Sequence, residues 1–160
     1  MIRILVDADA CPVKPEVYKV AARYDLPVLV VSNIPMRTPR EGRVELVLVG
    51  DGMDEADDKI VLLAGPEDIV ITADIPLAAR AVAKGARALG PKGREFTEES
   101  VGDTLATRDL MTHLREAGSV TGGPAPFAKK DRSRFLDCLD RIVQALRRGT
   151  GPPAAGGTAP

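Results

Sequence analysis

The chain has 160 residues, 44% of them hydrophobic and 28% charged, with a formal net charge of -1 at pH 7. These values are typical of an ordinary folded domain and exclude a disordered, fibrous or strongly basic nucleic-acid-coating protein. No hydrophobic run approaches the ~20 residues that cross a bilayer, and Asp7 and Asp9 interrupt the hydrophobic stretch near the start. We therefore expect a cytoplasmic protein with no membrane segment, and the two cysteines, Cys11 and Cys138, fit a reducing compartment.

Strand and helix patterns alternate along the first part of the chain. The strands are β-branched runs with little polar alternation, as expected for strands that are buried on both faces. Strand–helix–strand repetition predicts an α/β fold, a three-layer sandwich with a mostly parallel central sheet of about five strands. The expected strands are residues 2–6, 27–32, 44–49, 69–72 and 86–89, and the expected helices lie around residues 17–24, 54–64, 76–84, 101–115 and 131–148.

The second half of the chain changes character. Residues 119–128 form a Gly/Pro-rich loop between the last two predicted helices. Residues 149–160 consist mainly of Gly, Pro, Ala and Thr and predict a disordered tail. We accordingly expect a single domain over residues 1–148.

Carboxylates follow two of the predicted strands. Asp7 and Asp9 come directly after the first strand, and Asp74 follows the fourth. If these strands are neighbours in a parallel sheet, the three acids converge at one edge, where they repel one another unless a cation lies between them. Hard divalent cations such as Mg²⁺ and Mn²⁺ take oxygen ligands of this kind. The pattern predicts a metal-dependent phosphate-chemistry site.

Two more acids, Asp54 and Asp57, lie three residues apart at the start of a predicted helix. Such a spacing places them on one helix face, from which either could complete the shell of an ion. The alternative is structural, because acids at a helix start suit the helix dipole. Asp74 has a similar alternative, since it stands two residues before Pro76 at a helix-capping position.

Several segments carry a family resemblance. They are residues 6–12 (VDADACP), 70–78 (VITADIPLA), 84–86 (KGA), 122–124 (GGP) and 131–135 (DRSRF). With these segments, the chain resembles the YaiI/YqxD family from about residue 2 to residue 146. That family is placed among the PIN-like folds, so the resemblance implies a PIN-like domain with a nuclease-like architecture.

The resemblance also implies roles for particular residues. PIN-like nucleases carry acids after the first strand, on a central helix and after the fourth strand. These acids hold Mg²⁺ or Mn²⁺ and activate water for phosphodiester hydrolysis. The resemblance favours RNA over DNA as the substrate. The catalytic and metal-binding residues implied here are Asp7, Asp9, Asp57 (or Asp54) and Asp74, and the candidate substrate contacts are Arg37, Arg80 and Thr72. After Leu89 the nearest acid is Glu95, a departure from the PIN pattern that weakens the case for two metal ions.

Two other functions compete with the nuclease. One is a non-catalytic module that binds metal or RNA on the same fold. The other is a haloacid-dehalogenase-type phosphatase with Asp7 as nucleophile, because Asp7, Asp9, Ser32 and Asp51 imitate that family's motifs in order. Against the phosphatase, Cys11 stands where Thr or Val is expected, and no lysine lies between Ser32 and Asp51.

Overall fold

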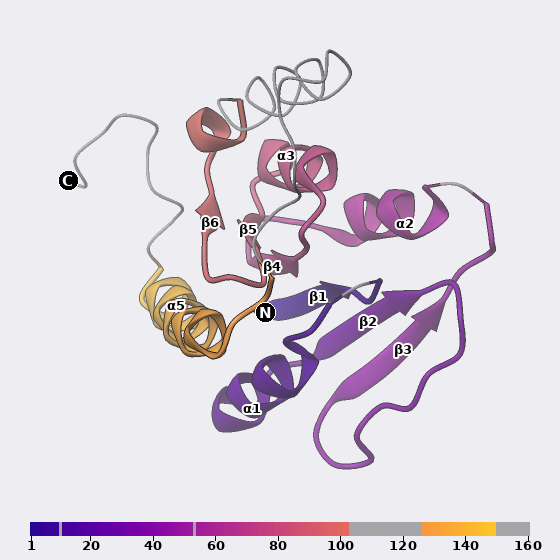
Figure 1. The fold of residues 1–160 in the computed structure, drawn as a ribbon, viewed down its shortest axis with the longest axis horizontal. Coiled ribbons are helices and arrows are strands. Elements are labelled where there is room, and N and C mark those ends of the chain that lie inside the picture. The colour runs from indigo at the N-terminus through magenta and orange to yellow at the C-terminus, as the bar shows by residue number, and fades with distance from the viewer. Residues whose placement is uncertain (10, 53, 103–125, 150–160) are drawn as a thin grey trace.

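The computed structural model describes residues 1–9, 11–52, 54–102 and 126–149. In this part of the chain, a six-stranded sheet has the order β3-β2-β1-β4-β5-β6 (Figure 1). All neighbouring strands are parallel except β5 and β6, which pair antiparallel. The strands are β1 (Arg3–Asp7), β2 (Val28–Ser32), β3 (Val44–Leu48), β4 (Asp68–Ile71), β5 (Arg87–Leu89) and β6 (Glu95–Phe96).

Helices cover both faces of the sheet. They are α1 (Lys14–Tyr24), α2 (Glu55–Leu63), α3 (Ile75–Ala83) and α5 (Lys129–Arg147). Successive residues of a strand point to opposite faces, so Ile4 and Val6 pack with α1 and α5 while Leu5 packs with α2 and α3. Figure 1 shows these two helix pairs on opposite sides of the sheet. The predicted three-layer α/β sandwich is confirmed.

A partly buried ion pair joins two central strands at the amino edge of the sheet. The Arg3 guanidinium donates to both carboxylate oxygens of Asp68, with Nε–Oδ1 at 3.0 Å and Nη2–Oδ2 at 2.8 Å. Nη2 also donates to the carbonyl of Leu63 at the end of α2. Together with the buried Asp68 side chain, this pairing joins β1, β4 and α2. It lies at the edge of the sheet opposite to the carboxyl ends of the parallel strands.

The structure adds a strand that the sequence pattern does not predict. β6 has 2 residues and pairs with β5 after the turn at residues 90–93. A strand this short has no periodicity of its own, so only its partner reveals it. α1 also begins earlier than predicted, at Lys14, with Pro15 in its first turn, where the missing N–H costs nothing.

Some predictions fall on residues that the structure does not describe. Residues 101–102 of the predicted helix 101–115 are helical, and the rest of that helix lies outside the described residues. The same holds for residues 119–125 of the Gly/Pro-rich loop and residues 150–160 of the tail. Among the helices that are described, none combines the length and hydrophobicity needed to cross a membrane.

Candidate acidic site at the carboxyl edge of the sheet

The two strands that carry the predicted acids are neighbours. β1 and β4 pair in parallel, with Val6 opposite Ile71. Asp7 is the last residue of β1, and Asp74 lies just beyond the end of β4. The strand order reverses here, because β2 and β3 lie on one side of β1 while β4 and β5 lie on the other. Crevices at such switch points are the usual ligand sites of open α/β sheets.

A cavity of about 570 Å³ opens at this edge. It brings together all five predicted acids, which come from the end of β1, the segment before α2, α2 itself and the start of α3. The residues that line it are Asp7, Ala8, Asp9, Lys14, Val31, Ser32, Asn33, Ile34, Met36, Asp51, Gly52, Asp54, Ala56, Asp57 and Asp74.

Asp7 is half-buried at the end of β1. The Thr72 hydroxyl donates to its Oδ2 at 2.8 Å, and the backbone N–H of Asp9 donates to the same carboxylate. Burial raises the pKa of Asp7, the charges of Asp9 and Asp74 raise it further, and the two hydrogen bonds oppose the rise. Asp7 is therefore a carboxylate of the cavity lining that two hydrogen bonds hold in place.

Asp57 carries the largest perturbation in the cavity. Its pKa is raised to about 6, first by burial and then by the charges of Asp74, Asp7 and Asp54, while Arg80 opposes the rise. Asp57 lies on the first turn of α2, so the helix brings it toward the two strand ends. Burial together with neighbouring negative charge is the environment found at sites that hold a cation or a proton.

Asp74 has a structural role as well as a place in the cavity. It is the N-cap of α3: its Oδ1 accepts from the backbone N–H of Leu77 at 3.0 Å. Its own backbone N–H donates to the Thr72 hydroxyl at 3.0 Å. The capping interpretation is thus correct, and it does not compete with a ligand role, because a carboxylate has a second oxygen.

Asp54 and Asp9 are exposed at the cavity rim. Asp54 occupies the N-cap position of α2 with φ of 66°, and within the described residues its side chain makes no capping hydrogen bond. Asp tolerates this left-handed conformation better than most residues. The side chain of Asp54 is consequently available to the cavity.

The three predicted substrate contacts lie in different surroundings. Thr72 is buried, and its hydroxyl joins Asp7 to Asp74, so the structure shows it positioning the acids. Arg80 pairs with Asp58 at 2.9 Å on the exposed side of α2 and α3, near enough to Asp57 to lower its pKa. Arg37 is exposed on the loop after β2, next to the cavity-lining Met36.

Sequence reasoning missed several polar residues of this cavity. Lys14 begins α1 and is a cation among the acids, and Asn33 follows Ser32 at the end of β2. Their positions in the sequence could have indicated them, because Lys14 lies at a helix start and Asn33 lies just after a strand. Burial raises the pKa of the nearby Cys11 thiol, which packs against the core and is poorly suited to act as a nucleophile.

Carboxylate oxygens are the type of ligand that a hard divalent cation binds. Within the described ranges, no three His, Cys, Asp or Glu side chains are arranged to hold a metal ion. Mg²⁺ often takes only one or two carboxylates and completes its shell with water and substrate phosphate. Asp7, Asp57 and Asp74 offer oxygen donors whose repulsion such an ion would relieve.

These features define an α/β sandwich with an acidic cavity at its switch point. The model of the "Uncharacterized BCR, YaiI/YqxD family" matches residues 5–145, and the chain belongs to this family, as its motifs predict. That description names no reaction, so the function has to be argued from the site.

Close relatives cover nearly the whole chain. A UPF0178 protein of Rhodopseudomonas palustris is 56% identical over 146 residues, 91% of this chain and 94% of its own. A UPF0178 protein of Brucella ovis is 57% identical over 148 residues, 92% of each chain. The UPF0178 protein amb2838 of Paramagnetospirillum magneticum is 54% identical over 148 residues, 92% of this chain and 98% of its own. No solved structure matches the chain significantly.

Proposed function

We propose that the acidic cavity binds Mg²⁺ or Mn²⁺ and hydrolyses phosphodiester bonds, with RNA favoured over DNA. The observation that carries this proposal is the convergence of Asp7, Asp57 and Asp74, from three separate elements, on one cavity, where burial and neighbouring carboxylates raise the pKa values of Asp7 and Asp57. A structural protein gains nothing from such repulsion, whereas a cation site needs it. We infer the phosphodiester substrate and the preference for RNA from the resemblance to PIN-like nucleases.

The residues of the cavity would have different roles in the proposed reaction. Asp7 and Asp74, which the Thr72 hydroxyl joins, would supply one or two oxygens to the ion, and the nearby charge of Asp57 would add to its attraction. A bound divalent ion would supply charge for the phosphate oxygens and lower the pKa of a water. Lys14, and Arg37 on the adjacent loop, are the cations placed to contact a substrate phosphate.

Mn²⁺ binding to the purified full-length chain, measured by calorimetry, tests the metal site. Asp57 and Asp58 are adjacent on α2, and Asp57 lines the cavity while Asp58 pairs with Arg80 outside it. We expect Asp57→Asn to weaken Mn²⁺ binding by about tenfold or more, and the matched control Asp58→Asn to leave it unchanged. Wild-type protein that binds no Mn²⁺, or equal loss in both variants, would refute the metal site.

Cleavage is tested with RNA and DNA oligonucleotides in the presence of Mn²⁺. Asp7→Asn, purified in the same way, should abolish a cleavage that the wild type and Asp58→Asn both perform. Metal binding without cleavage of any substrate would instead support the non-catalytic module. A phosphate trapped covalently on Asp7 would replace the nuclease with the phosphatase, since direct hydrolysis by water forms no such intermediate.

A further inference from the structure

A second cavity lies between the β5–β6 hairpin and α5, and none of its lining residues belongs to the acidic site. Its volume is about 630 Å³. Three arginines line it: Arg87 from β5, and Arg134 and Arg141 from α5, with Glu95 of β6 as the acid among the lining residues. The two cavities therefore differ in charge, because several carboxylates line the first and three arginines line the second.

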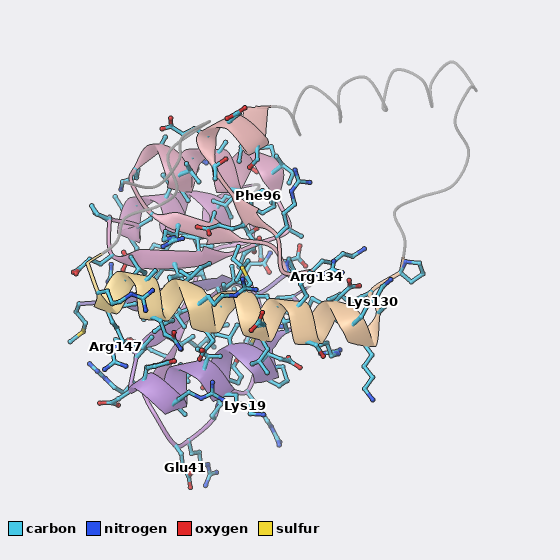
Figure 2. All side chains as sticks on the ribbon, turned by 90° about the vertical axis from the view of Figure 1, so that its left-hand side faces the viewer. Lys19, Glu41, Phe96, Lys130, Arg134 and Arg147 are labelled. Carbon is cyan, nitrogen blue, oxygen red and sulfur yellow. The ribbon has the colours of Figure 1, made fainter. Side chains whose placement is uncertain are left out.

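Helical spacing explains why α5 presents these side chains together. Arg134, Cys138 and Arg141 are four and three residues apart, so they form one stripe along the helix. Figure 2 shows Arg134 on the side of α5 that faces the hairpin end of the sheet. The turn before β6 packs closely here, because a Cβ on Gly93 would lie 2.7 Å from the backbone carbon of Arg134. The wall of the cavity is thus set by direct backbone contact.

Arg87 supplies the strongest sign that this cavity suits a hydrogen-bond acceptor. Its side chain is only 7% exposed, and it pairs with Glu95 through Nε–Oε2 at 2.7 Å and Nη2–Oε1 at 2.9 Å. The remaining nitrogen, Nη1, is buried and has no hydrogen-bond partner among the described residues. Buried guanidinium nitrogens normally find an acceptor, and Arg87 lines the cavity from which an acceptor could come.

The local charges leave an excess of positive charge. Glu95 neutralises Arg87, and Asp137 pairs with Arg141 on the exposed side of α5. Arg134 has no ion pair with any residue in the described part of the chain. A ligand in this cavity would meet three guanidinium groups, of which two are paired with a carboxylate, so one positive charge remains in excess, which favours an anion.

We propose that this cavity binds a phosphate group carried by a small molecule. The three arginines reach the cavity from a strand and from two turns of a helix, so their guanidinium groups are not coplanar. A tetrahedral phosphate offers acceptor oxygens in several directions and can bind such a set, whereas the two oxygens of a carboxylate are satisfied by one planar guanidinium group. The cavity exceeds the size of a phosphate ion, and Ile142 and Ala145 give it an apolar wall for the organic part of an ester.

Cys138 provides a reporter inside the cavity, because it lines the same wall and is partly exposed. The experiment measures alkylation of the metal-free, full-length protein by iodoacetamide, quantified separately at Cys138 and Cys11 by mass spectrometry, at constant ionic strength. Inorganic phosphate and phenyl phosphate are the probes, and acetate is the carboxylate control. A probe at about ten times its Kd should slow the alkylation of Cys138 about tenfold and leave Cys11 unchanged.

Two matched variants identify the arginine contact. Arg134→Gln removes an exposed cation from the cavity wall, and Arg148→Gln makes the same change at the C-cap of the helix, away from it. We expect protection by phosphate to disappear in Arg134→Gln and to persist in Arg148→Gln. The proposal is overturned if neither phosphate probe protects Cys138, if Arg134→Gln is protected as well as the wild type, or if acetate protects equally.

Discussion

A single hydroxyl organises the acidic site. Thr72 donates to Asp7 and accepts from the backbone N–H of Asp74, so one side chain joins the end of β1 to the start of α3. It is buried, and both of its partners line the cavity. At this position a β-branched residue suits the strand end, and the hydroxyl ties the Asp7 carboxylate to the backbone of Asp74.

Replacing Thr72 by Val tests this role. The substitution keeps the shape but leaves the Asp7 carboxylate and the Asp74 N–H without their partner, so we expect the free energy of unfolding to fall by about 1–3 kcal/mol. The pKa of Asp7, followed by carboxyl-carbon NMR, should rise further, because the Thr72 hydrogen bond lowers it. Thr72→Ser retains the hydroxyl and serves as the control, and an equal loss in that variant would show that the methyl group matters instead.

Asp57 makes the stability of the protein depend on pH. Its pKa is about 6 in the folded state against an ordinary value of 3.8, so between these values the folded protein holds a proton that the unfolded chain has lost. The contribution of this group is fully present below pH 3.8 and is lost as the pH rises through about 6. Burial of the Asp57 carboxylate, together with its repulsion by Asp74, Asp7 and Asp54, thus acts against the fold at neutral pH.

Denaturation curves recorded across this pH range check the prediction. Asp57→Asn cannot ionise, so we expect it to be more stable than the wild type above pH 6 and to lack the part of the decline that Asp57 causes. Asp58→Asn, its exposed neighbour, should keep the wild-type pH profile. A wild-type carboxyl titration in which Asp57 ionises near its ordinary pKa would contradict the argument.

At the scale of secondary-structure elements, the contact between the β5–β6 turn and α5 depends on a residue without a side chain. Gly93 has φ of 86°, and a Cβ there would meet the backbone of Arg134 at 2.7 Å and of Phe135 at 2.8 Å. A helix backbone cannot give way as a flexible side chain can. The turn and the helix approach so closely only because position 93 is glycine.

Substituting two glycines by Ala distinguishes the energetic cost of the contact with α5 from the cost of the left-handed backbone conformation. Gly42 has φ of 83°, and a Cβ there would have nothing within 4 Å, so Gly42→Ala should cost only the left-handed conformation, about 1–2 kcal/mol. Gly93→Ala has the same conformational cost plus the clash with α5, and we expect it to lose at least about 1–3 kcal/mol more. Urea denaturation measures both, and equal losses would show that the helix moves aside freely.

Asp74 shows how one residue serves both an element and a site. As the N-cap of α3 it accepts the Leu77 N–H, a bond that Asn can replace and Ala cannot. We expect Asp74→Ala to lose about 1 kcal/mol of unfolding free energy and Asp74→Asn much less, while both weaken Mn²⁺ binding. Unchanged Mn²⁺ affinity in Asp74→Asn, measured by calorimetry, would leave Asp74 with the capping role alone.

At the scale of the whole molecule, α5 completes the core that the first part of the chain begins. Phe135, Leu139, Ile142 and Val143 are fully or almost fully buried and pack with α1 and one face of the sheet. Figure 2 shows α5 lying along the molecule beside α1. Arg132 donates to the Pro12 carbonyl at 2.7 Å, which joins this helix to the loop between the acidic site and α1.

The same substitution at two leucines measures how much α5 contributes. Leu139 is 0% exposed in the core and Leu62 is 71% exposed on α2. We expect Leu139→Ala to lower the free energy of unfolding by about 2–5 kcal/mol because it leaves a cavity, and Leu62→Ala to change it by about 0.5 kcal/mol or less. A small loss at Leu139 would mean that α5 packs loosely on the sheet.

Much of the fold follows from local patterns. The β-branched runs of β1, β2 and β4 and the punctuation by Gly65 and Pro66 predict the alternation of strands and helices, because periodicity and turn chemistry are local properties. The start of α1 and the two-residue β6 escaped prediction, since each depends on a neighbour that the pattern cannot show.

The sequence by itself determined that acids follow two strand ends, since the order of residues after a hydrophobic run needs no tertiary contact. Only the tertiary structure decided that β1 and β4 are neighbours, that Thr72 joins Asp7 to Asp74, and that Asp57 reaches them from α2. It also decided that Arg87 lines the same cavity as two arginines of α5. Strand order and helix docking arise from packing between residues far apart in the chain, which local patterns do not encode.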